Sequence, residues 1–142
     1  MTAPRFLVDT NVLSELARPV PERRVVDWFA TLVGPATSAV VCYELARGIE
    51  LLGVGKRKRF LESWFAELLG VLEVVPVEQT TALAAARIEA SAGRVGRSVE
   101  IRDLLIVATA QVVGCQLATR NLDDMRGFGV IAYDPFTDTR TL

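Results

Sequence analysis

Acidic side chains stand in this sequence at positions where a packed core would normally hold apolar residues. Asp9 directly follows the apolar run at 6–8, which predicts that it ends a buried strand. Glu44 and Asp103 lie in helical patterns with mostly apolar neighbours, and a carboxylate there is costly unless it is paired or faces a cleft. An acid pair at 123–124 follows another apolar run just past its end. In a parallel α/β domain, strand ends and helix starts meet at one sheet edge, so we expect these acids to converge there.

Each acid taken alone also has an ordinary structural explanation. Asp9 or Asn11 is a suitable N-cap for the helix that follows. Glu44 is spaced to pair with Arg47 at i,i+3. Asp103 is stabilised by the dipole of its helix and by the neighbouring arginine. The acids at 123–124 are unremarkable in a polar loop, so only the coincidence of all these positions points to chemistry.

Four carboxylates in one cleft repel one another, which raises their pKa values unless a positive charge is present. The sequence contains no His, which excludes His-based acid–base catalysis, Ser-His-Asp triads and His-ligated zinc. The natural counter-charge is therefore a divalent cation. Donor sets made only of oxygen select hard ions, so Mg²⁺ or Mn²⁺ is expected rather than zinc.

Length and composition bound the class of protein. The chain has 142 residues, enough for a single domain with a sizeable core. It is 51% hydrophobic, with a mean hydropathy of +0.32, which excludes intrinsic disorder and suggests apolar surface for a partner. Its 16 Lys and Arg against 17 Asp and Glu exclude a strongly basic coat for nucleic acid, although not a local basic patch.

Neither a disulfide framework nor a membrane segment is expected. Cys42 and Cys115 both lie in apolar surroundings and are predicted to be buried thiols. The apolar residues after Arg5 are too few for a signal peptide, and the longest uncharged runs are interrupted by Gly, Pro or Gln. A soluble, cytoplasmic protein is therefore predicted.

Short apolar runs alternate with helical patterns, which is typical of a parallel α/β sheet. Ser38 and Ser98 are predicted to cap two of the helices, and Gly114 to end the second of these. Together the elements predict a three-layer α/β/α fold with a mostly parallel sheet of about five strands, spanning residues 1–142 as a single domain. We expect strands at 6–8, 35–37, 72–77, 116–119 and 130–133, and helices at 11–17, 25–32, 39–52, 58–69, 80–92 and 99–113.

Four segments, taken in order, resemble the motifs of PIN-domain proteins. They are LVDTNVLSEL at 7–16, YELARGI at 43–49, DLLIVATA at 103–110 and TRNLDD at 119–124. Their order and spacing are similar to those of the VapC toxins, especially the FitB-like branch. The resemblance extends over nearly the whole chain, to Asp134-Pro135-Phe136.

The resemblance implies roles for particular residues. Asp9 and Asp103 are expected as direct metal ligands, with Glu44 and Asp124 binding directly or through water. Many relatives have an acid where Asn121 stands, which makes this cluster one charge poorer. The acidic cluster implied by the resemblance is Asp9, Glu44, Asp103 and Asp124, supported by the polar residues Asn11, Thr119 and Asn121.

The function that the resemblance implies is that of a metal-dependent endoribonuclease, the toxin of a type II toxin–antitoxin pair, using Mg²⁺ with Mn²⁺ as a substitute. It also implies a homodimer and a cognate antitoxin whose tail covers the acidic site. For contact with RNA we favour Arg94 and Arg97, in a Gly-containing loop before Asp103, over the basic run at 56–59.

Two other functions fit parts of the pattern. A receiver-like or phosphatase domain would use Asp9 as a phosphate acceptor, but such domains need a nearby Lys, and every Lys lies within 56–58. A catalytically silent PIN-like module that binds RNA or protein is the second alternative. The presence of acids at all four positions argues against it.

Overall fold

A computed structural model describes residues 4–141 and shows one sheet with the strand order β3-β2-β1-β4-β5-β6. Strands β1 to β5 run parallel, and β6 pairs antiparallel with β5. The strands are β1 (Phe6–Val8), β2 (Ala36–Ser38), β3 (Glu73–Val75), β4 (Gln116–Ala118), β5 (Ala132–Asp134) and β6 (Thr139–Arg140). The sheet is thus mostly parallel as predicted, with one short edge strand beyond the five expected.

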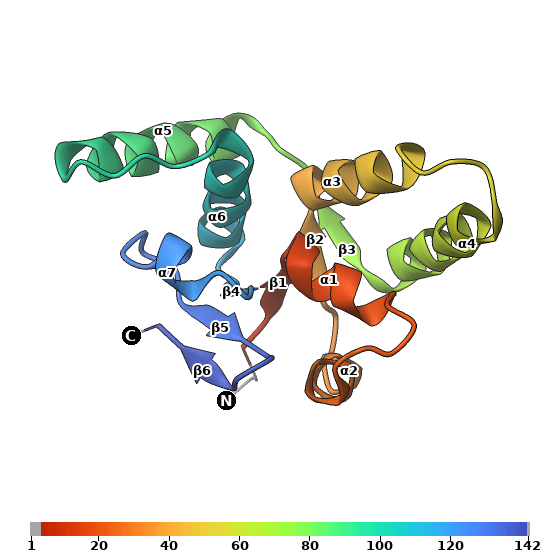
Figure 1. Ribbon diagram of the computed structural model, residues 1–142. Helices are drawn as coiled ribbons and strands as arrows, with labels where there is room; N and C mark the ends of the chain where they lie inside the picture. Colours follow the sequence, from red (N-terminus) through yellow and green to blue (C-terminus); the bar gives the residue numbers. More distant parts are fainter. Residues whose placement is uncertain (1–3, 142) are drawn as a thin grey trace.

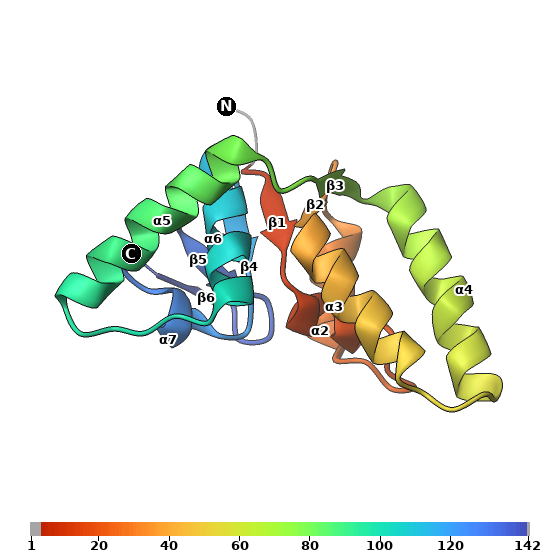
Figure 2. The same cartoon turned by 90° about the horizontal axis from the view of Figure 1, so that it is seen from above.

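Helices cover both faces of the sheet, which confirms the three-layer prediction. Figures 1 and 2 show α5 and α6 packed together beside the β4–β5 half of the sheet, and α3 and α4 beside the β2–β3 half. The helices are α1 (Thr10–Leu16), α2 (Arg23–Ala30), α3 (Ala39–Glu50), α4 (Lys56–Val71), α5 (Gln79–Arg94), α6 (Ile101–Val113) and α7 (Leu122–Met125).

The core lies between the sheet and these helices. Leu7, Val8 and Leu117 on the two central strands are fully buried. Ile106 and Val107 on α6 are also fully buried, as its apolar pattern on nearly every side predicts. Cys42 is half-buried and Cys115 is buried, and both are free thiols.

The predicted start of α6 was wrong by two residues. Glu100, rather than Ser98, is its N-cap, and the Glu100 carboxylate accepts the backbone N–H groups of Arg102 and Asp103. In the segment before the helix, Arg97 reaches across to the backbone carbonyl of Asp124 in α7. Ser38 does cap α3, and Gly114 ends α6 in the left-handed conformation.

Strand register brings several polar residues to one edge of the sheet. Val8 pairs with Ala118, and Ala118 pairs with Tyr133. The next residues along these strands, Asp9 and Thr119, therefore start the loops at the carboxyl edge. Among residues 4–141 no helix has the length and apolarity needed to cross a bilayer.

Candidate active site

Asp9 is the most deeply buried acid of the predicted cluster, with only 4% of its surface exposed. It caps α1, because its Oδ1 accepts the backbone N–H of Thr10 at 2.8 Å. Its Oδ2 accepts the hydroxyl of Thr119 at 2.7 Å. The structural explanation for Asp9 is thus correct, but a cap alone does not account for a buried carboxylate with a second, long-range partner.

Thr119 and Asn11 hold Asp9 in place. Thr119 is fully buried, and its Oγ1 also accepts the backbone N–H of Asn121 at 3.1 Å. The Asn11 amide lies 3.4 Å from both Asp9 Oδ2 and Thr119 Oγ1, and its Oδ1 accepts the backbone N–H of Arg120. Two of the predicted supporting side chains therefore contact Asp9, whereas Asn121 is exposed and joins the network through its backbone.

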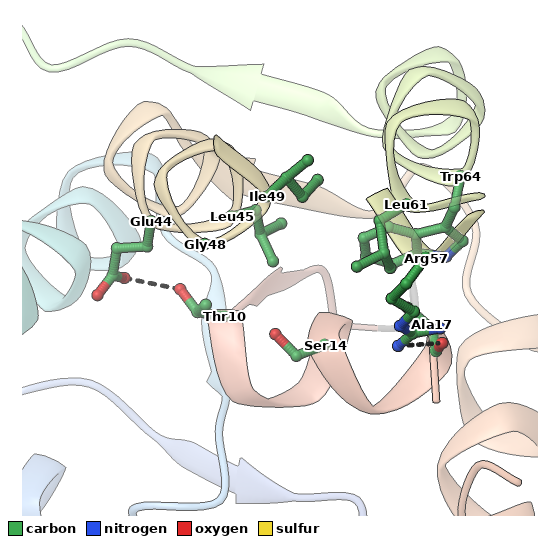
Figure 3. A pocket seen from close by; sticks show the side chains of 10 residues that line it. All are labelled: Thr10, Ser14, Ala17, Glu44, Leu45, Gly48, Ile49, Arg57, Leu61 and Trp64. Carbon is green, nitrogen blue, oxygen red and sulfur yellow. Dashed lines mark hydrogen bonds between the residues drawn. The ribbon is translucent and has the colours of Figure 1, made fainter. Parts of the chain in front are cut away.

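Glu44 is directed to the same place by a contact across 34 residues of sequence. Its Oε1 accepts the hydroxyl of Thr10 at 2.7 Å, the residue that follows Asp9 (Figure 3). The ion pairs among residues 4–141 do not include one between Glu44 and Arg47, so the local pairing considered from the sequence is absent. The Glu44 side chain thus contacts the N-terminus of α1 and not a neighbouring residue of its own helix, α3.

Asp103 lies in the first turn of α6 and is half-buried. The neighbouring Arg102 pairs with Glu100 at 3.1 Å instead of with Asp103. The Asp103 carboxylate accepts no hydrogen bond within residues 4–141. The nearby arginine therefore does not satisfy this acid, although it still attracts its charge.

The two acids after β4 both lie on α7 and differ in their charge partners. Asp123 is 95% exposed and pairs with Arg126 at 3.3 Å. Asp123 and Asp124 are both exposed and both border the same hollow as Asp103. The negative charge of Asp124 raises the pKa of Asp103. The effect on Asp103, and not exposure or position, distinguishes Asp124, the predicted member of the cluster, from its neighbour.

The electrostatics connect the acids to one another. Burial raises the pKa of Asp9 to about 6, against the hydrogen bonds from Thr119 and Thr10 and with the help of the charges on Asp103 and Glu44. The pKa of Asp103 is raised by burial first, and then by Glu100, Glu44 and Asp124. The carboxylates therefore lie close enough to disfavour one another's ionisation.

The oxygen donors of these acids suit a hard cation, although they do not already form a preorganised metal site. Within residues 4–141 no three acidic or thiol side chains already form a cation site. Mg²⁺ needs only one or two carboxylates, since it keeps several waters. Asp9 and Asp103 offer oxygen donors, and Asp103 has no competing donor group within this part of the chain. The residues present therefore fit a Mg²⁺ or Mn²⁺ ion.

Arg97 has a structural partner that sequence reasoning missed. Its guanidinium donates to the backbone carbonyls of Arg126 and of Asp124, the latter at 3.2 Å, and lies 4.2 Å from the ring centroid of Phe128. It thereby clamps α7, the short helix that carries Asp124. Arg94 is the last residue of α5 rather than a loop residue. Contact of either arginine with RNA remains a prediction.

Asp134 is a further buried acid at this edge, and the sequence pattern did not single it out. It ends β5, is 7% exposed, and its Oδ1 accepts the backbone N–H of Phe136 at 2.8 Å. Its position after the last parallel strand is the signal that could have found it. Because this carboxylate already holds the turn that follows, we assign it a structural role.

The fold and these motifs match one family. The family model described as PIN domain matches residues 6–128, and the chain belongs to this family. The chain is 32% identical to the toxin FitB of Neisseria gonorrhoeae over 94% of this chain and 99% of that protein. It is 30% identical to a VapC ribonuclease of Sinorhizobium fredii over 92% of this chain and 97% of that protein.

Solved structures agree with this assignment. The crystal structure of FitAcB from Neisseria gonorrhoeae superposes with a TM-score of 0.87 at 32% identity, covering 92% of this chain and 98% of that one. VapBC from Salmonella typhimurium, at 22% identity, shares the fold with a TM-score of 0.82, covering 94% of this chain and 99% of that one.

Proposed function

We propose that this protein is a metal-dependent endoribonuclease of the cytoplasm and the toxin of a toxin–antitoxin pair. The observation that carries the proposal is the set of mutually repelling acids at the carboxyl edge of a PIN-domain sheet. The relatives named as a toxin and as a ribonuclease support the same reaction class.

The acids would share the work of holding a divalent ion. Asp9 and Asp103 would bind Mg²⁺ directly, with Glu44 and Asp124 binding directly or through water. When bound, the ion would polarise the scissile phosphate and lower the pKa of an attacking water. The Thr119 hydroxyl fixes the Asp9 carboxylate, and the Thr10 hydroxyl fixes Glu44, so both acids are oriented before substrate arrives.

An apolar pocket next to the acids supports the antitoxin part of the proposal. It lies between α1, α3 and α4, with Glu44 and Thr10 at one end and Leu61 and Trp64 at the other (Figure 3). A peptide seated along Leu45 and reaching Glu44 would cover the acidic site. We therefore propose that the antitoxin tail binds here.

Cleavage of RNA by purified, antitoxin-free protein tests the proposed function. We expect single-stranded RNA to be cut with Mg²⁺ or Mn²⁺ and to remain intact with EDTA, because the acids alone supply no Lewis acid. Gel analysis of end-labelled RNA gives the measurement. RNA binding without cleavage in either metal would instead favour a catalytically silent PIN-like module.

Substitution of Arg97 should weaken metal binding and catalysis, although its side chain contacts none of the acidic side chains of the site. We expect Arg97→Met to lower both Mn²⁺ affinity and kcat by about tenfold, at the lower end of what loss of an orienting partner costs. Isothermal titration with Mn²⁺ and cleavage kinetics provide the measurements. Arg94→Met is the matched control, since Arg94 is exposed at the end of α5. If both variants raise KM alone, these arginines contact RNA, as predicted from the sequence, and Arg97 does not position Asp124.

A further inference from the structure

Two arginines from distant parts of the chain meet at Phe136. The Arg120 guanidinium lies over the Phe136 ring, 4.2 Å from its centroid. Arg24, on the first turn of α2, donates to the Phe136 backbone carbonyl at 3.3 Å. The turn after β5 extends toward α2 (Figure 1), and the two cations contact different parts of Phe136, Arg24 its carbonyl and Arg120 its ring.

Neither of these arginines is neutralised by a carboxylate within residues 4–141. Other arginines close to them in the sequence form ion pairs instead: Arg23 pairs with Asp27, and Arg126 pairs with Asp123. An anion bound beside Phe136 would pair with both guanidinium charges. A guanidinium stacked on a ring keeps its in-plane N–H donors available for the oxygens of a phosphate.

The arginine pair is tied to the acidic site by short links. The Arg120 backbone N–H donates to Asn11 Oδ1 at 3.1 Å, and the same Asn11 side chain lies beside Asp9 and Thr119. Arg120 also lines one open hollow at the carboxyl edge of the sheet, together with Arg126 and the acids Asp123, Asp124 and Asp134. A strand whose reacting phosphate lies at the acids would therefore pass next to Arg120.

We propose that Arg120 and Arg24, gathered on Phe136, bind a backbone phosphodiester of the RNA strand next to the one that is cut. The inference rests on the proposed function and locates the substrate strand beside the acids. The site reads charge and not base sequence, because it consists of two guanidinium groups and a ring that already carries one of them. It consists of other residues than Arg94 and Arg97, the pair favoured from the sequence.

Substitution of the two arginines, with a matched control on the same helix turn, tests the site. The variants are Arg120→Gln, Arg24→Gln and the control Arg23→Gln, whose side chain is exposed and faces Asp27. The probe is a fluorescein-labelled, single-stranded RNA 12-mer of mixed sequence, followed by anisotropy in EDTA at several salt concentrations and by cleavage kinetics in Mn²⁺. We expect Arg120→Gln and Arg24→Gln each to raise Kd and KM about five- to tenfold with kcat within about twofold. Each should also lower the slope of log K against log salt by about 0.7, the value for one phosphate contact on a single strand.

Three further measurements keep the result specific. Arg120→Lys retains the charge without the stacked geometry and should recover part of the affinity, which a folding defect would not allow. A dinucleotide with a single phosphodiester has no neighbouring phosphate, so its cleavage should be the same in wild type and Arg120→Gln. Circular dichroism and thermal unfolding show that each variant is folded.

The outcomes separate this inference from the proposed function. Loss of RNA affinity in both variants supports the phosphate site even if wild type binds RNA without cutting it, which would defeat the proposed function alone. Cleavage by wild type with equal Kd, KM and salt slope in Arg120→Gln, Arg24→Gln and Arg23→Gln overturns the inference alone. Failure of wild type to bind the RNA overturns it as well. So does a loss of affinity confined to the antitoxin, which would assign the pair to an acidic segment of that protein.

Discussion

Asp9→Asn is expected to lower the rate of RNA cleavage by at least about 100-fold, since loss of an outer partner of a metal ligand alone costs about 10–100-fold. The substitution removes the charge of the most buried acid while keeping its shape. The amide still has an oxygen for the Thr10 N–H, so the cap of α1 is retained. Initial rates with Mg²⁺ and with Mn²⁺ measure the effect, and toxicity in cells should fall in parallel.

The exposed acid Asp123 supplies the control for this prediction. Asp123→Asn removes the same charge from a side chain that is 95% exposed and pairs only with Arg126. Its cleavage rate should stay within about twofold of wild type, because isolated exposed charges are screened. Asp103→Asn should match Asp9→Asn. If Asp9→Asn and Asp103→Asn both keep a tenth or more of wild-type activity, neither Asp9 nor Asp103 belongs to the metal site.

Asp103→Asn should also make the metal-free protein more stable than wild type at neutral pH. The Asp103 carboxylate accepts no hydrogen bond within residues 4–141, so the amide loses none there. It does remove a charge that burial and the neighbouring Glu100, Glu44 and Asp124 disfavour. We expect a gain of about 0.5–2 kcal/mol in the free energy of unfolding in EDTA, after solvent screening. Mn²⁺ should reverse the order, since only wild type keeps the full ligand set.

The pH dependence follows from the direction of these shifts. A carboxyl whose pKa is higher in the folded state than in the unfolded chain binds more protons when folded, so stability rises as pH falls through the folded value. For Asp9 this range runs from about 6 down to its unfolded value of about 3.9. Because the pKa of Asp103 is raised in the same direction, wild type should recover stability on acidification and the advantage of Asp103→Asn should shrink.

Thermal unfolding of wild type and Asp103→Asn, in EDTA and in millimolar Mn²⁺, at neutral pH and at about pH 5, measures these effects. An Asp103→Asn protein that is less stable in EDTA, together with equal Mn²⁺ shifts in both proteins, would mean that the acids do not form one metal-binding cluster. The proposed mechanism would then lose its physical basis.

Local sequence was sufficient for most of the elements and for the identity of the acids. Apolar runs and helical spacing depend on the residues of one segment, so strands β1 and β4 and the buried helix α6 are recognisable in the sequence alone. A carboxylate next to such a run is visible for the same reason, which is why Asp9, Glu44 and Asp103 stand out. The error at Ser98 also has a local cause. Glu100 also has a side-chain acceptor, and it caps the N–H groups of Arg102 and Asp103 two residues after the predicted start.

The sequence by itself determined the α/β pattern and the set of acids, because periodicity and residue type are properties of single segments. Only the tertiary structure decided what each side chain contacts. Thr10 rather than Arg47 holds Glu44, Arg97 clamps the short helix of Asp124, and two arginines from distant parts of the chain contact Phe136. These contacts depend on sheet order and on where loops return to the carboxyl edge, and a hydrogen bond or a stacked ring leaves no periodic trace in the chain.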